Sequence, residues 1–298
     1  MNKLLLIFLL VISATVYATH NRAGEITYTH VSGLTYEITV TTYTRDQSPA
    51  DRPELPISWG DNSPVDSIDR ISKVFLGNDI NKNIYVGRHT YPGPSPSPYI
   101  ISVEDPNRNE NIINIPNSVN IVFYLETKLY INPFQGINNS PVLLNPPIDN
   151  ACVNQIYIHN PGAVDPDGDS LYYSIDRSRA QGGALIPGYT LPNASNFLTI
   201  NSINGDLIWN TPTMAGEFNI AILIEEFRNG QRIGAILRDM QITVYPNCPP
   251  PPDITTVSDT CIIAGDFLGF NIFATGSSAV TLTSTGIPYS LPNAANFQ

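Results

Sequence analysis

The sequence predicts an all-β chain of tandem β-sandwich domains, and three observations lead to this class. Residues 189–197 read YTLPNASNF and residues 289–297 read YSLPNAANF, so seven of nine positions recur one hundred positions apart. That period matches a whole sandwich domain and is too long for a solenoid unit. The chain is rich in turn formers, with 26 Pro and 20 Gly among 298 residues. No segment shows a sustained 3.6-residue apolar repeat, so strands and turns are favoured over helices.

Residues 1–18 have the pattern of a signal peptide. One basic residue, Lys3, precedes an apolar run over 4–12, and small residues stand at Val16 and Ala18. The run is shorter than the roughly 18 to 20 apolar residues that a membrane-spanning helix needs, and no later segment approaches that length. We therefore expect a secreted or cell-surface protein with no transmembrane segment in this chain.

The charge balance excludes two classes of partner. The formal charge is -11, and removal of the leader with Lys3 makes it about -12. No block of Lys or Arg occurs anywhere in the rest of the chain. Because nucleic acids and anionic membranes are bound through basic patches, neither is an expected partner.

The first domain is expected at 19–137. Apolar and polar residues alternate through 24–44, with a break at Ser32-Gly33, which predicts a hairpin with one buried face. A turn at 57–63, a strand late in 89–105 and another within 118–131 follow. The Pro-rich stretch 138–150 then marks a linker.

The second domain is expected at 138–248 and ends in a second Pro-rich linker. The dipeptides Asn204-Gly205 and Asn229-Gly230 are strong hairpin turns. Residues 249–298 are expected to be the start of a further, incomplete repeat. Strands are predicted near 153–160, 170–176, 197–210 and 217–245.

Three cysteines occur in a chain that is expected to be exported, where disulfides persist. Cys152 and Cys261 have similar surroundings, DNACV and SDTCI, and Cys248 lies in the linker PNCPPPP. We expect Cys248–Cys261, with Cys152–Cys248 as the alternative, because sequence alone does not fix connectivity.

The segments WGDNS (59–63) and HTYPGP (89–94), with YIISV (99–103), resemble the PKD domain, an immunoglobulin-like sandwich. Its signature is a W-x-F-G-D-G-S turn followed by an H-x-Y strand. Here the Phe is missing, and Asn62 replaces a Gly whose left-handed backbone Asn tolerates. Asp61 is expected to cap its own turn. The resemblance implies that His89 packs in the core. Trp59 and Trp209 are also expected in cores.

The stretches 160–175 and 204–226 resemble the cadherin-like, immunoglobulin-like repeats of bacterial surface proteins. The opening THNRAGEITY (19–28) and the strand ILRDMQI (236–242) resemble the N-terminal region of large secreted proteins of gliding Bacteroidota, the gliding-motility-associated type. Members of that group usually end in a sorting domain read by the type IX secretion machinery, and no such domain occurs in this sequence.

Asp165, Asp167 and Asp169, in DPDGDS, are the candidate metal ligands. Alternate Asp side chains around a Gly turn can converge on calcium, which takes six to eight oxygen ligands. The other interpretation is an Asx turn in which Gly168 takes the positive φ. No fourth ligand is identified beyond Glu225 and Glu226, which are weak candidates.

The sequence predicts a non-enzymatic protein. The histidines His20, His30, His89 and His159 are scattered, and G-x-S-x-G, H-E-x-x-H and phosphate-loop motifs are absent from the sequence. We expect an extracellular structural or adhesive stalk that binds glycans or surface proteins, with calcium as its candidate cofactor. The alternative is a set of accessory domains that position a catalytic domain beyond residue 298. The sequence leaves the ligand and the oligomeric state open.

The repeated phrase itself is expected to be structural. Each sandwich would need the same corner, with Leu191 and Phe197 buried and a turn at Pro192-Asn193 between them.

Overall fold

The computed structural model describes residues 21–48 and 51–250, and beyond them 252–255, 260, 261, 263, 266–276 and 282. The chain divides into two compact units, one ending at Pro246 and one beginning at Asn247. The predicted signal peptide and the second copy of the repeated phrase lie outside the described residues. No helix in the described part is long and apolar enough to cross a membrane.

The first unit is built on one eleven-stranded sheet with the order β1-β2-β5-β4-β3-β6-β7-β16-β15-β12, and β9 pairs with β16 beside this path. β1 also pairs with β16, at Gly24 and Asp239, so the path from β1 round to β16 closes on itself. The strands are β1 (Asn21–Ser32), β2 (Thr35–Arg45), β3 (Glu54–Ser58), β4 (Asp66–Gly77), β5 (Ile80–Thr90), β6 (Tyr99–Asp105), β7 (Phe123–Leu129), β9 (Ile148–Cys152), β12 (Ser170–Asp176), β15 (Gly216–Arg228) and β16 (Gln231–Tyr245).

The first hydrophobic core lies inside this closed path. β2 buries alternate residues, as its sequence pattern predicts, and the β1–β2 hairpin turns at Gly33, whose φ is 54°. Trp59 is buried in the same core, as expected. The core is completed by Ile26, Ile38, Val40, Ile57, Tyr85, Ile101, Phe123 and Leu125, among others.

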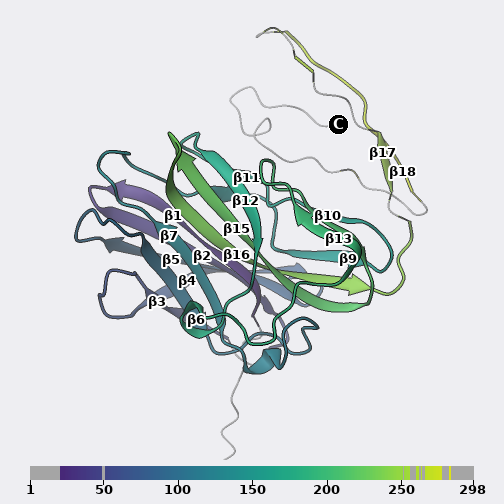
Figure 1. Ribbon diagram of the computed structural model, residues 1–298, viewed down its shortest axis with the longest axis horizontal. Coiled ribbons are helices and arrows are strands. Elements are labelled where there is room, and N and C mark those ends of the chain that lie inside the picture. The colour runs from purple at the N-terminus through teal and green to yellow at the C-terminus, as the bar shows by residue number, and fades with distance from the viewer. Residues whose placement is uncertain are drawn as a thin grey trace, which may run out of the picture. The chain divides into compact units, whose positions relative to one another are not determined.

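A second core lies where a small sheet packs on the face of β15 and β16. The small sheet has the order β10 (Tyr157–His159), β14 (Leu207–Pro212), β13 (Ala194–Ile200). Trp209 from β14 is fully buried and meets Phe218 of β15 edge-on, with ring centroids 5.2 Å apart. In Figure 1, β15 and β16 run side by side as a long hairpin, which turns at Asn229-Gly230 as predicted. The all-β, sandwich prediction is therefore confirmed.

The two larger cores fall on either side of the predicted boundary at 137/138, but a smaller cluster of Ile112, Ile115, Ile186 and Tyr189 crosses it, and the sheet does not break there. β16, from the second half, pairs with β7 and with β1 of the first half. Residues up to Pro246 thus form a single compact unit, and the division into domains stays a prediction. The remaining elements of this unit are short: β8 (Val142–Leu143), β11 (Ala163–Val164), η1 (Ser118–Asn120) and η2 (Gln181–Gly183).

In the described part of the second unit, β17 (Asp253–Thr255) pairs with β18 (Phe273–Thr275) in antiparallel fashion. The expectation of a further sandwich at 249–298 therefore stays a prediction.

The expected burial of Leu191 and Phe197 is wrong, since each is 42% exposed. The residues of the phrase that are buried are Tyr189 and Pro192. The predicted turn at Pro192-Asn193 is also wrong, because the segment leads directly into β13, and the carbonyl of Asn193 accepts the Trp209 indole N–H at 3.0 Å. The phrase therefore holds the buried Trp209 through its backbone, so its larger apolar side chains are free to face solvent.

The expected Cys248–Cys261 disulfide is also wrong. Cys152 and Cys248 are disulfide-bonded, whereas Cys261 is free and exposed. The alternative pairing, Cys152–Cys248, is therefore the one that forms. The physical reason lies in the sheet, because β9 runs parallel to β16 and places Cys152 opposite Tyr245, three residues before Cys248.

Candidate functional site

The predicted acidic loop connects β11 to β12. One carboxylate oxygen from each of Asp165, Asp167 and Asp169 lies within 4.8 Å of the others. Asp165 Oδ1 accepts the backbone N–H groups of Asp167 and Asp169 at 2.9 and 3.0 Å, and Gly168 has φ 79°. The loop thus has the Asx-turn geometry, and it brings the three predicted ligands together.

Two of the three carboxylates have partners from elsewhere in the chain. Asp169 accepts from Nε and Nη2 of Arg228, at 2.8 and 2.5 Å. Asp167 accepts from the backbone N and the Nδ2 of Asn139, at 2.7 and 2.9 Å. Arg228 also donates to the carbonyl oxygens of Gln135 and Ile137, both at 2.8 Å. The loop is therefore fastened to the segment that joins the two cores.

The third carboxylate is the one with capacity left for a cation. Asp165 Oδ2 is buried and has no hydrogen-bond partner in the described part of the chain. Burial, with repulsion from Asp169 and Asp167 in addition, raises the pKa of Asp165 above its usual value. Arg228 supplies one positive charge to three carboxylates, so the residues present can accommodate a further cation at the Asp165 side.

Glu226, a weak candidate ligand in the sequence, is fully buried in β15 and turned toward the protein interior. Its Oε2 accepts from Asn138 Nδ2 at 2.6 Å, and its Oε1 has no partner in the described structure. A Cβ on Gly234 would collide with that oxygen, so the glycine makes room for the carboxyl group. Burial, with repulsion from Asp165, Asp169 and Asp167, raises the pKa of Glu226 to about 8. At neutral pH it is mostly a neutral acid. The other candidate, Glu225, pairs with Arg232.

Glu226 gives a pH prediction. The pKa of Glu226 is about 8 in the folded state, above the ordinary 4.5, so protonation of Glu226 favours the folded state. This contribution to the free energy of unfolding is fully present below about pH 4.5 and is lost as pH rises through 8. We expect a decline of roughly 1 kcal/mol per pH unit between pH 6 and 7 that is absent in Glu226→Gln. Urea unfolding at each pH measures it. Glu225→Gln is the control and should keep the decline. An equal decline in Glu226→Gln would contradict the prediction.

The WGDNS turn is structural, as predicted. Asp61 Oδ1 accepts the N–H of Ser63 at 3.0 Å, and Asn62 has φ 67°. His89 Nε2 lies 2.7 Å from Asp61 Oδ2, and its ring stacks on Trp59 with centroids 4.8 Å apart. His89 is thus held between the Asp61 carboxylate and the Trp59 indole.

Two buried ion pairs that sequence reasoning missed join the halves of the first unit. Arg108 donates to both carboxylate oxygens of Asp239, at 3.0 and 2.8 Å, and Asn219 donates to the same Asp239 at 2.8 Å. Arg238 Nε lies 2.9 Å from Glu25 Oε2. Each pair links a residue before position 109 to one after position 237. Such separations leave no trace in local sequence pattern.

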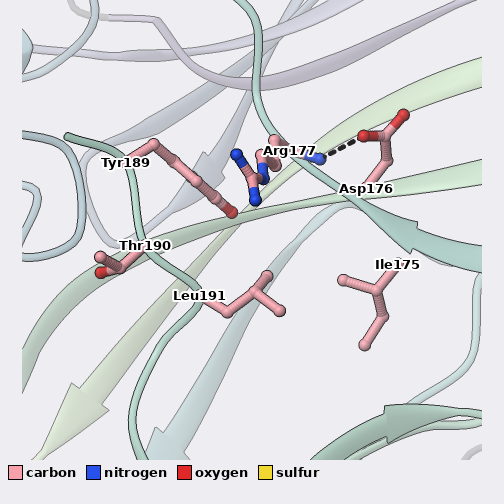
Figure 2. A pocket seen from close by; sticks show the side chains of 6 residues that line it. All are labelled: Ile175, Asp176, Arg177, Tyr189, Thr190 and Leu191. Atoms are coloured by element: carbon pink, nitrogen blue, oxygen red, sulfur yellow. Dashed lines mark hydrogen bonds between the residues drawn. The ribbon is translucent and has the colours of Figure 1, made fainter. Parts of the chain in front are cut away.

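A pocket of about 510 Å³ opens beside the end of β12, and Figure 2 shows the six side chains that line it. The carboxylate of Asp176 accepts the N–H of Arg177 and an Nη2 of Arg179, both at 2.7 Å. The sequence signal that could have indicated this pocket is the repeated phrase, whose first three residues line one wall. The lining residues are Ile175, Asp176, Arg177, Tyr189, Thr190 and Leu191.

Comparisons with known proteins add little to this description. No family model and no curated protein matches the chain. A solved structure described as "Tandem Ig repeats of Dlar" is similar over 76% of this chain and 100% of its own, at 11% identity and a TM-score of 0.23.

Proposed function

We propose that the protein is a non-enzymatic, extracellular or cell-surface module with a structural or adhesive role. The observation that carries this proposal is that charged side chains in the interior pair with one another across the fold. Arg108 with Asp239, Arg238 with Glu25 and Arg228 with Asp169 each tie together segments far apart in the chain. These ion pairs therefore hold distant strands together and have a structural role. A catalytic site would instead need titratable groups that converge on an open cavity.

The histidines support the same proposal. In the described structure, His89 bonds Asp61 and His159 bonds Asp149, and neither is hydrogen-bonded to a serine or cysteine side chain. The Cys152–Cys248 disulfide suits an oxidising compartment outside the cytoplasm. The resemblance to PKD-like, cadherin-like and gliding-motility-associated repeats favours the surface of a gliding bacterium, with type IX secretion as the route and glycans or surface proteins as the partners.

Adhesion of the full chain tests the proposal. Beads that carry the folded chain should be retained under flow on at least one glycan-coated or surface-protein-coated glass. Beads that carry the same chain after reduction and heating should wash off, because weak repeated contacts need the folded surface. Equal retention of both kinds of bead would contradict an adhesive function. A catalytic domain in the same reading frame after residue 298 would assign the accessory role instead.

We further propose that calcium binds the loop of Asp165, Asp167 and Asp169. The convergence of the three carboxylates and the unpartnered Asp165 Oδ2 support this. Because Asp167 and Asp169 hold Asn139 and Arg228, a bound cation would stiffen the connection between the two cores.

Thermal unfolding in calcium and in chelator tests this second proposal. Extracellular sites bind calcium at about 0.1 to 1 mM, so the titration extends to several mM. The melting temperature should rise with calcium, and the rise should vanish in Asp167→Asn. The control, Asp66→Asn at the exposed start of β4, should keep it. Identical melting in calcium and chelator would leave the loop as an Asx turn closed by Arg228.

A further inference from the structure

We propose that the pocket beside β12 binds an extended acidic peptide of a partner protein, with a carboxylate of the peptide on Arg177. This inference rests on the proposed adhesive function and specifies its site and the chemical class of its partner. Three features of the described residues support it: an unpaired guanidinium, an open strand edge and an apolar wall.

The unpaired guanidinium belongs to Arg177. Of the eleven arginines in the sequence, all within the described range, ten form ion pairs with carboxylates. Arg177 alone among them has no carboxylate partner in the described structure. Its neighbour Asp176 already pairs with Arg179, at 2.7 Å. In a chain with formal charge -11, a guanidinium left over at a pocket is well suited to a carboxylate from outside, which it can bind through two N–H groups.

The open edge belongs to β12, which ends the strand order and, among the described strands, pairs only with β15. The N–H of Tyr173 donates to the carbonyl of Ser202 at 3.0 Å, so it points away from β15. Backbone groups alternate along a strand, so Ile175 presents its N–H and C=O on the same outer side, at the pocket wall. No described group bonds them. An extended peptide can add to such an edge through main-chain hydrogen bonds.

The residues that line the pocket favour a peptide over an acidic sugar as its ligand. Ile175 and the exposed Leu191 offer apolar surface for the alternate side chains of an added strand. A sugar ring packs its C–H groups against the exposed face of an aromatic ring, because that face is negatively polarised. Tyr189, the aromatic residue of the lining, is buried, and its hydroxyl donates to the carbonyl of Asn219 at 3.0 Å. Figure 2 shows its ring directed inward from the 189–191 segment, toward Arg177.

Peptide binding by the full chain tests the inference. The probe is the blocked peptide acetyl-Val-Glu-Val-Glu-Val-amide, and its partner probe has Gln at both Glu positions. Titration calorimetry should show binding of the acidic peptide that is at least about tenfold tighter than binding of the Gln peptide. Arg177→Gln should remove that preference. The matched control is Arg88→Gln, which removes an exposed arginine that pairs with Glu37, and it should keep the preference.

A second variant tests the strand edge without changing charge. Ile175→Pro removes the outward N–H but no bond to β15, so β12 should still pair, and binding of the acidic peptide should weaken about tenfold. Equal affinity for both peptides, equal binding by Arg177→Gln, or stronger binding of an oligogalacturonate probe would overturn the inference.

The bead assay separates this inference from the proposed function. Retention of the wild-type chain with loss in Arg177→Gln supports both. Equal retention of wild type and Arg177→Gln overturns the pocket as the adhesive site while the adhesive function stands. Failure of the wild-type beads to adhere overturns the proposed function, and with it the partner assigned to the pocket.

Discussion

Replacement of Arg108 by Met is expected to destabilise the first unit by about 3 to 5 kcal/mol. Arg108 is fully buried, and its guanidinium meets both carboxylate oxygens of Asp239 and lies 5.0 Å from the ring centre of Phe123. Within the described part of the chain, its loss leaves the Asn219 amide as the one side chain bonded to the buried Asp239 carboxylate. An uncompensated buried carboxylate is costly, and that cost exceeds the apolar contact that Met restores. Urea unfolding of the full chain measures the change.

Two further variants identify the cause of that loss. Arg108→Met with Asp239→Leu removes both charges together, and the double variant should be more stable than the sum of the single losses predicts. Arg88→Met, at an exposed arginine that pairs with Glu37, should change stability by less than about 1 kcal/mol. A loss below about 1 kcal/mol for Arg108→Met would show that the pair contributes little to the fold.

The sequence predicted those parts of the fold that depend on local pattern. The alternation in 35–45 and the Asn229-Gly230 turn each specify a hairpin, and both hairpins form as predicted. The continuity of the sheet was not predictable in this way, because the pairing of β16 with β7 and β1 joins strands more than one hundred residues apart. Proline-rich composition at 138–150 indicated a linker, but composition does not show which strands pair across it.

The same limit applies to the candidate sites. Two-residue spacing was enough to predict that Asp165, Asp167 and Asp169 would converge. Arg228, the partner of Asp169, lies 59 positions away, and no local pattern relates the two. The exposure of Leu191 and Phe197 was not predicted, for a related reason. An apolar residue of a strand is buried only where another element packs on its face of the strand, and local sequence does not show that packing.

The disulfide gives the second large expected effect. Cys152 ends β9 opposite Tyr245 of β16, so its bond to Cys248 fastens the parallel β9–β16 pair at its open end. In the chain-entropy model, closing a loop of roughly one hundred residues restricts the unfolded state by about 4.7 kcal/mol. Native strain commonly reduces that gain, so we expect Cys152→Ala with Cys248→Ala to lose about 2 to 5 kcal/mol.

Reduction of the wild-type chain gives an independent measure of the same bond. Dithiothreitol should lower the urea midpoint of the wild type to that of the double variant, and it should leave the double variant unchanged. Cys261→Ala is the matched control, because Cys261 is free and exposed and its loss should not shift the midpoint. A peptide map that joins Cys248 to Cys261, or a double variant as stable as the oxidised wild type, would contradict this account. Because Cys152 is the last residue of β9, the loss should be accompanied by faster hydrogen exchange in 148–152 than in the interior of β15.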